Sequence, residues 1–108
     1  MTDVKEVIKS KISGKKVMIF SKSTCGNCKT TKELFPQYFG KELDRKDYEV
    51  WEIDREPNNM CAQLQDELRN ITGERTVPRV FINGKCIGGG SKTLTLHRCG
   101  KLAKLLTQ

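Results

Sequence analysis

The chain has 108 residues, which is enough for one compact domain and too few for two, so we expect a single domain over residues 1–108. Hydrophobic residues make up 36% and charged residues 31% of the sequence, a balance that excludes disordered and fibrous chains. Apolar runs stay far below the roughly 18 residues of a membrane helix, so we expect no membrane partner. The net charge of +7 comes without a long block of like charge or an interleaved aromatic set, so we expect no nucleic-acid partner.

The cysteine count and the N-terminus both bear on the redox compartment. The first residues, MTDVKEVIKSKISGKK, interleave charges with apolar residues and offer no continuous hydrophobic stretch of a secretory signal. Five cysteines, an odd number, argue against a full set of disulfides. We therefore expect a reducing, cytoplasmic location.

The first half of the chain predicts a helix, a strand, a second helix and a second strand. Apolar residues at three- and four-residue steps predict a helix that ends near Gly14, and residues 16–20 are typical of a strand buried on both faces. From Gly26 the sequence favours a helix until Pro36 ends or kinks it. Residues 48–54 alternate as a strand does.

The second half predicts a helix, two paired strands and a final helix. Helical spacing over residues 60–73 ends at a glycine, which is typical of a helix terminus. The pair Asn83-Gly84 joins two β runs, because both residues tolerate the positive φ of a two-residue hairpin turn. Ser91 is expected to cap a helix that runs toward Gly100, with one or two further turns after it.

This order of elements predicts an α/β fold. A strand, a helix and a second strand joined by a crossover of this length make the first two strands parallel. The hairpin adds an antiparallel pair to the same sheet. We therefore expect a mixed four-stranded β-sheet flanked by helices on both faces.

Two thiols lie three residues apart in the stretch SKSTCGNCKT. Cys25 is predicted to follow the first strand and to begin the second helix, where unpaired N–H groups and the helix dipole stabilise a thiolate. Lys22 adds a nearby positive charge. Cys28 shares the same helix face at a separation suited to a disulfide, so we expect Cys25 to attack and Cys28 to resolve.

Structural zinc is the alternative use of this thiol pair. A second pair of ligands would have to come from Cys86, or from His97 with Cys99. The sequence contains no second Cys-x-x-Cys and no spaced histidine pair, so redox chemistry is favoured over a zinc site.

A proline begins the third predicted strand in the triplet Thr76, Val77 and Pro78. A cis bond before this proline would turn the backbone of Val77 outward, where it could pair with an extended, peptide-like ligand. A trans proline at a strand start is the commoner arrangement, so the proline by itself does not decide between the two.

Together, the stretches SKSTCGNCK and LQDELRNITGERTVPRVFINGKCIGG and the following Ser91 resemble the glutaredoxins, which have the thioredoxin-like fold. The similarity runs in order from residue 16 to about residue 106. It implies a monomeric, glutathione-dependent thiol-disulfide oxidoreductase that acts on glutathionylated and disulfide-containing proteins. In such a protein Cys25 takes up glutathione, and Cys28 is needed only for protein disulfides.

The resemblance also implies a glutathione site. Lys22 and Gln65 would contact the glycyl carboxylate of glutathione, and Val77 would pair with its backbone beside Thr76 and cis-Pro78. Gly89 and Ser91 would receive the γ-glutamyl carboxylate at a helix N-terminus, an arrangement that favours anions on physical grounds too. The seven predicted binding residues, with the two cysteines, make up the expected site.

The sequence departs from the usual family pattern at the active site. Gly26 and Asn27 stand where the family usually has Pro and Tyr, and Lys92 stands where it generally has an Asp. A glycine after the first cysteine also resembles glutaredoxins that hold a [2Fe-2S] cluster between two subunits. Cluster binding through Cys25 and glutathione is therefore the alternative hypothesis.

The remaining cysteines and the histidine have no role in the predicted mechanism. Cys61 and Cys86 are expected to be small buried hydrophobic residues or spare thiols, and Cys99 a surface thiol open to glutathionylation or to an intermolecular disulfide. His97 is expected at the surface, because a preformed thiolate requires no general base.

Overall fold

The computed structural model describes residues 3–108. The strands are β1 (Val17–Ser21), β2 (Tyr48–Glu52), β3 (Arg79–Ile82) and β4 (Lys85–Gly88). The α-helices are α1 (Val4–Gly14), α2 (Gly26–Leu34), α3 (Met60–Thr72), α4 (Gly90–Arg98) and α5 (Lys101–Leu106). Three short 3-10 helices are η1 (Phe35–Tyr38), η2 (Arg45–Asp47) and η3 (Ile53–Arg55).

The four strands form one mixed sheet in the order β2-β1-β3-β4. β1 is parallel to β2 and antiparallel to β3, and β4 pairs antiparallel with β3. The predicted topology is therefore confirmed. β1 is central and buried along its whole length, which explains its continuous apolar sequence.

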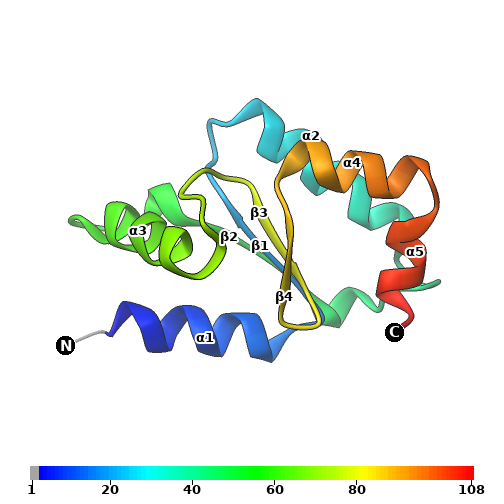
Figure 1. Cartoon of the computed structure of the whole chain (residues 1–108), viewed down its shortest axis with the longest axis horizontal. Coiled ribbons are helices and arrows are strands. Elements are labelled where there is room, and N and C mark those ends of the chain that lie inside the picture. Colours follow the sequence, from blue (N-terminus) through cyan, green and yellow to red (C-terminus); the bar gives the residue numbers. More distant parts are fainter. Residues whose placement is uncertain (1–2) are drawn as a thin grey trace.

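Alternating side chains of β1 belong to two separate hydrophobic cores, one on each face of the sheet. Val17 and Ile19 pack with residues of α2, α4 and α5, and Met18 and Phe20 pack with residues of α1 and α3. Figure 1 shows the sheet between these two groups of helices. Helices on both faces were predicted, and this arrangement brings α2 and α4 side by side.

The local sequence explains where the elements turn and end. Pro36 ends α2 as predicted, because the helix stops at Leu34 and continues only as the 3-10 turn η1. Asn83 and Gly84 have φ values of 53° and 82°, as the predicted two-residue hairpin turn requires.

Two sequence-based predictions were wrong. The strand predicted over residues 48–54 ends at Glu52, because the chain then turns into the 3-10 helix η3. Ser91 does not cap the last helix, since Gly89 has the extended N-cap conformation and Ser91 already lies in the first turn of α4. The predicted helix toward Gly100, with further turns after it, is confirmed: Gly100, with a φ of 81°, separates α4 from α5.

Within residues 3–108, no helix combines the length and the hydrophobicity needed to cross a membrane.

Candidate active site

Cys25 lies at the N-terminus of α2, immediately after the carboxyl end of β1. It is the N-cap residue, and its Sγ accepts a hydrogen bond from the backbone N–H of Cys28 at 3.4 Å. A turn closed by the Cys25 N–H and the Lys22 carbonyl, 3.2 Å apart, leads into the helix. The half-exposed sulfur therefore takes the place of the oxygen that usually caps a helix.

The pKa of the Cys25 thiol is lowered. Partial burial of the thiol acts in the opposite direction and raises the pKa. It is outweighed by hydrogen bonds from the Cys28 side chain and from the backbone N–H groups of Cys28 and Asn27, with a further contribution from the charge of Lys22. The site thus favours a thiolate at Cys25, as the position at a helix N-terminus predicted.

The Cys28 thiol differs from Cys25 in both burial and pKa. Its side chain is fully buried, and burial is the largest cause of its raised pKa, to which Cys25 also contributes. The backbone N–H of Lys22 donates to Cys28 Sγ at 3.5 Å and partly opposes that increase. One half-exposed thiol with a lowered pKa and one buried thiol with a raised pKa therefore lie next to each other.

Two carboxylates, Glu52 at the end of β2 and Asp54 in η3, hold the elements around the loop that leads from β1 to Cys25. Asp54 accepts hydrogen bonds from the backbone N–H and the hydroxyl of Ser23, at 3.0 and 2.5 Å. Glu52 accepts from the hydroxyl of Ser21 at 3.1 Å and pairs with Lys32 of α2 at 2.7 Å. Sequence reasoning missed these supports.

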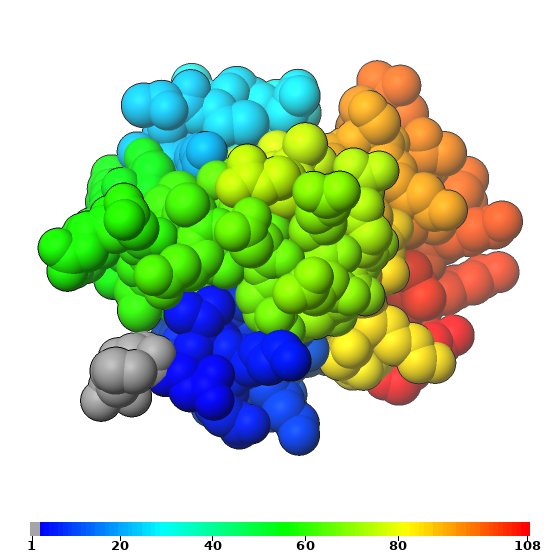
Figure 2. Space-filling view, turned by 60° about the vertical axis from the view of Figure 1, so that its left-hand side comes forward, coloured from blue at the N-terminus to red at the C-terminus, as the bar shows by residue number. Residues whose placement is uncertain are grey.

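A groove beside the thiols has a volume of about 440 Å³. It is lined by Asn27, Thr76, Val77, Pro78, Arg79, Gly89, Gly90, Ser91 and Lys92. On the face shown in Figure 2, the yellow segment around residues 76–80 lies between the light-blue start of α2 and the orange α4. Five of the predicted binding residues therefore lie together: Thr76, Val77, Pro78, Gly89 and Ser91.

The bond between Val77 and Pro78 is cis. Of the cis and trans arrangements that the sequence left open at this proline, the structure has the cis one. Pro78 is buried, whereas Thr76 is exposed at the edge of the groove.

Lys22 and Gln65 do not line this groove. Lys22 is half-buried in the turn before Cys25, close enough for its charge to act on the thiol. The Gln65 side chain is 9% exposed, and its amide N–H donates to the Arg75 carbonyl at 3.0 Å. Gln65 thereby holds the segment that precedes Thr76, and its contact with a ligand stays a prediction.

Arg79 is a groove residue that sequence reasoning missed. Its Nε donates to the Pro78 carbonyl at 3.2 Å, and its guanidinium lies where a side chain on Gly89 would be. The sequence could have indicated this role, because Arg79 is a basic residue that directly follows the Thr-Val-Pro triplet.

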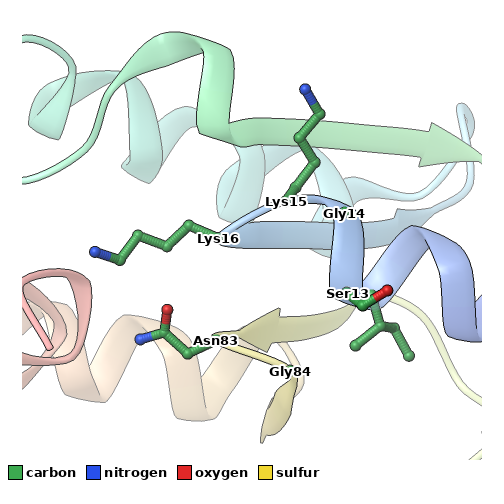
Figure 3. Close-up of a pocket in the computed structure, with 7 residues that line it drawn as sticks. Ser13, Gly14, Lys15, Lys16, Asn83 and Gly84 are labelled. Atoms are coloured by element: carbon green, nitrogen blue, oxygen red, sulfur yellow. The ribbon is translucent and has the colours of Figure 1, made fainter.

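A second hollow of the same volume, about 440 Å³, lies at the other end of the sheet. Figure 3 shows its lining residues around the end of α1 and the turn between β3 and β4, with Lys15 and Lys16 pointing in different directions. Neither hollow has a cysteine in its lining, but the first groove is lined by Asn27, which lies between Cys25 and Cys28 in the chain. Volume alone therefore does not identify the reactive site.

The expectation for His97 was wrong. His97 is half-buried, and its Nδ1 is hydrogen-bonded to the Tyr38 hydroxyl at 2.6 Å, because α4 packs beside the η1 turn that follows α2. Cys61 and Cys86 are half-buried against one core, and Cys99 is exposed. Across residues 3–108, no group of three or more His, Cys, Asp or Glu side chains is arranged to hold a metal ion.

A sheet of this order, with a thiol pair at a helix N-terminus and a cis-proline before β3, defines a thioredoxin-like thiol-disulfide protein. The Glutaredoxin family model matches residues 17–87. The chain belongs to the glutaredoxin family, whose members are generally thiol oxidoreductases.

Curated relatives and solved structures agree with this assignment. Glutaredoxin-C4 of Arabidopsis thaliana is 44% identical over 94% of this chain and 69% of its own length. The glutaredoxin of Ricinus communis is 40% identical over 100% of this chain and 94% of its own length. The chain spans 60% of the length of the mitochondrial glutaredoxin-2 of Mus musculus, with 41% identity over 94% of this chain.

The crystal structure of a buckwheat glutaredoxin–glutathione complex has a similar fold, with a TM-score of 0.82 and 36% identity. The similarity covers 96% of this chain and 87% of the buckwheat chain.

Proposed function

We propose that this protein is a glutathione-dependent oxidoreductase that reduces protein–glutathione mixed disulfides and protein disulfides. The observation that carries the proposal is the Cys25 sulfur, which caps α2 and accepts the Cys28 N–H at 3.4 Å. Such a thiolate is a ready nucleophile at neutral pH, where an ordinary thiol with a pKa of about 8.5 is mostly protonated.

In the monothiol route, Cys25 alone exchanges disulfides. Its thiolate attacks the glutathione sulfur of a mixed disulfide, a Cys25–glutathione disulfide forms, and the substrate leaves as a thiolate. The thiolate of a second glutathione then attacks the bound glutathione sulfur. Glutathione disulfide leaves, and the Cys25 thiolate is regenerated.

In the dithiol route, Cys28 completes the reaction. Cys25 attacks a protein disulfide, one substrate sulfur leaves as a thiolate, and the other stays bonded to Cys25. Cys28 loses its proton and attacks the Cys25 sulfur, which releases the second substrate thiolate and leaves a Cys25–Cys28 disulfide. Two glutathiones then reduce this disulfide and are themselves oxidised to glutathione disulfide.

The groove beside Cys25 is the proposed glutathione site. The buckwheat protein of similar fold was crystallised with glutathione, and five of the residues predicted to bind it line this groove here. The backbone at Val77 would pair with the tripeptide, and the start of α4 after Gly89 offers unpaired N–H groups to a carboxylate. Lys22 and Gln65 would receive the glycyl carboxylate.

The test is turnover of a glutathione mixed disulfide by wild type, Cys25→Ser and Cys28→Ser at several pH values. We expect Cys25→Ser to lose activity by at least about a thousandfold, because hydroxyls do not exchange disulfides. Cys28→Ser should keep the monothiol route. The wild-type rate should persist below the ordinary thiol pKa, because the pKa of Cys25 is lowered.

A protein disulfide substrate provides the matched control. Cys28→Ser should fail to release this substrate although it still deglutathionylates the other one. Equal activity of wild type and Cys25→Ser with either substrate would contradict the proposal.

An iron-sulfur cluster held between two subunits is the second hypothesis, and it rests on Gly26. Each chain would offer Cys25 as its thiol ligand, because Cys25 is half-exposed and the Cys28 side chain is buried. Anaerobic reconstitution with iron, sulfide and glutathione tests this hypothesis, and a colourless monomer would contradict it. A coloured dimer would favour the cluster.

A further inference from the structure

The end of the groove formed by the first residue of β3 and the start of α4 is cationic. Arg79 and Lys92 both line it, and the nine lining residues include no aspartate or glutamate. Within residues 3–108, four ion pairs form and none of them involves Arg79 or Lys92. Two positive charges therefore share one groove without a carboxylate from the protein.

The positions of Lys92 and Arg79 depend on two adjacent glycines, Gly88 and Gly89. Gly88 has a φ of 120°, and a Cβ on it would lie 2.9 Å from Lys92 Cβ, so the stem of Lys92 occupies that space. A Cβ on Gly89 would lie 2.5 Å from a terminal nitrogen of Arg79. The missing side chains of Gly88 and Gly89 thus allow both cations to pack beside the groove.

The N-terminus of α4 adds to the positive potential of the same place. The helix begins at Gly90, no side chain caps it, and the first backbone N–H groups of the helix are free for an anion. Carboxylates are favoured here by three separate features, whereas an ammonium group would meet two like charges. Glutathione carries an amino group next to its γ-glutamyl carboxylate, so it suits this end only in part.

We infer that this end of the groove selects disulfide substrates whose cysteine is flanked by acidic residues, with Lys92 as a specificity-determining residue. The inference rests on the proposed function and names its substrate class. An acidic polypeptide segment would lie along Val77 with a carboxylate between Arg79, Lys92 and the start of α4. Electron transfer follows the dithiol route, and the substrate supplies the disulfide that is reduced.

The experiment compares three symmetrical peptide disulfides in which the single cysteine is flanked by Glu, Gln or Lys. Fully reduced protein is mixed with each peptide without glutathione, and the released peptide thiol is measured after acid quenching. This single turnover reports only on the peptide. Wild type should react about tenfold faster with the Glu peptide than with the Lys peptide at low ionic strength, and the ratio should fall with salt.

Two charge-reversal variants separate the groove from the net charge. Lys92→Glu should bring the ratio close to one, and Lys92→Gln should give an intermediate value. Lys104→Glu changes the net charge equally but lies on α5, outside the groove, and should leave the ratio within about twofold of wild type.

The inference is overturned if wild type does not discriminate between the charged peptides, or if Lys104→Glu changes the ratio as much as Lys92→Glu does. It also fails if Lys92→Glu slows the Gln peptide as strongly as the Glu peptide, because charge would then not be the cause. If the Gln peptide reacts while the charged peptides do not differ, only this inference fails. If no peptide reacts, the proposed function fails with it.

Discussion

The two ends of the sheet carry hollows of the same volume, about 440 Å³, and each hollow is lined by two basic residues, but different ends of the helices lie there. At the end with the cysteines, α2 and α4 begin, at Gly26 and Gly90. At the other end, α1 finishes at Gly14, and the last carbonyls of α5 approach the β3–β4 turn. Helix N-termini present N–H groups, and helix C-termini present carbonyls.

This difference decides what each end can do. A thiolate or carboxylate is stabilised where two helices begin, so the active end suits Cys25 and an anionic ligand. Lysines are suited to the end where helices finish, and Lys15 and Lys16 lie there. The direction of the helices, and not the size of the hollow, therefore distinguishes the reactive end.

The largest difference in stability and turnover between the two ends is expected when a glycine at each end is replaced by valine. A Cβ on Gly90 would lie 3.0 Å from Thr31 Oγ1, which is fixed because it donates to the Asn27 carbonyl at 2.9 Å. Gly90→Val should therefore separate α4 from α2, lower the free energy of unfolding by about 2 kcal/mol and reduce kcat/KM about tenfold.

Gly14→Val is the matched control at the other end. A Cβ there would meet nothing within 4 Å, so we expect a change below about 0.5 kcal/mol and unchanged turnover. Urea unfolding and turnover of a glutathione mixed disulfide measure both quantities. Equal losses in the two variants would contradict the distinction between the ends.

A smaller effect, confined to stability, is expected in the β3–β4 turn. Asn83 has a φ of 53°, and its amide donates to the carbonyls of Leu105 and Gln108 at 3.3 and 3.4 Å. Asn83→Ala should lower the free energy of unfolding by about 1 kcal/mol, because alanine is strained at positive φ and the hydrogen bonds are lost. Turnover should stay within about twofold of wild type, because the turn is remote from Cys25.

Asn83→Gly serves as the control, since glycine adopts the positive φ without strain but makes neither hydrogen bond. It should recover part of the lost stability. A clear decrease in turnover of the folded Asn83→Ala protein would show that the two ends are coupled.

Local sequence patterns predicted the sheet and the position of Cys25. The apolar run of β1, the Asn83-Gly84 turn and the glycine-ended helices each depend on a few neighbouring residues, so the sequence alone was sufficient for them. The thiol environment followed from its place between a strand and a helix. The same reasoning failed at Ser91, where the backbone at Gly89 and not the residue type determines the N-cap.

Contacts between distant residues could not be predicted in this way. Ser23 meets Asp54 across 31 residues because β1 and β2 are parallel in a register that pairs Ser21 with Glu52. His97 meets Tyr38 across 59 residues through the packing of α4 beside η1. Such contacts depend on register and helix packing, which hydrophobic periodicity leaves undetermined.

The smallest expected effect concerns the carboxylate that holds the active-site loop. Hydrogen bonds from the hydroxyl and the backbone N–H of Ser23 lower the pKa of Asp54. A carboxyl group whose pKa is lower in the folded than in the unfolded state stabilises the fold fully above its unfolded pKa of about 3.9. That contribution is lost as the pH falls through the lower, folded pKa.

Asp54→Asn should therefore lower Tm slightly by a constant amount between about pH 5 and 7, and the difference from wild type should shrink below about pH 4. Asp47→Asn is the control near the other end of the sheet, because within residues 3–108 the Asp47 carboxylate makes no ion pair or hydrogen bond. Thermal unfolding from pH 2 to 7 measures both variants. If the Asp54→Asn difference persisted unchanged at pH 2, charge on Asp54 would not be what holds Ser23, and the loop before Cys25 would depend on shape alone.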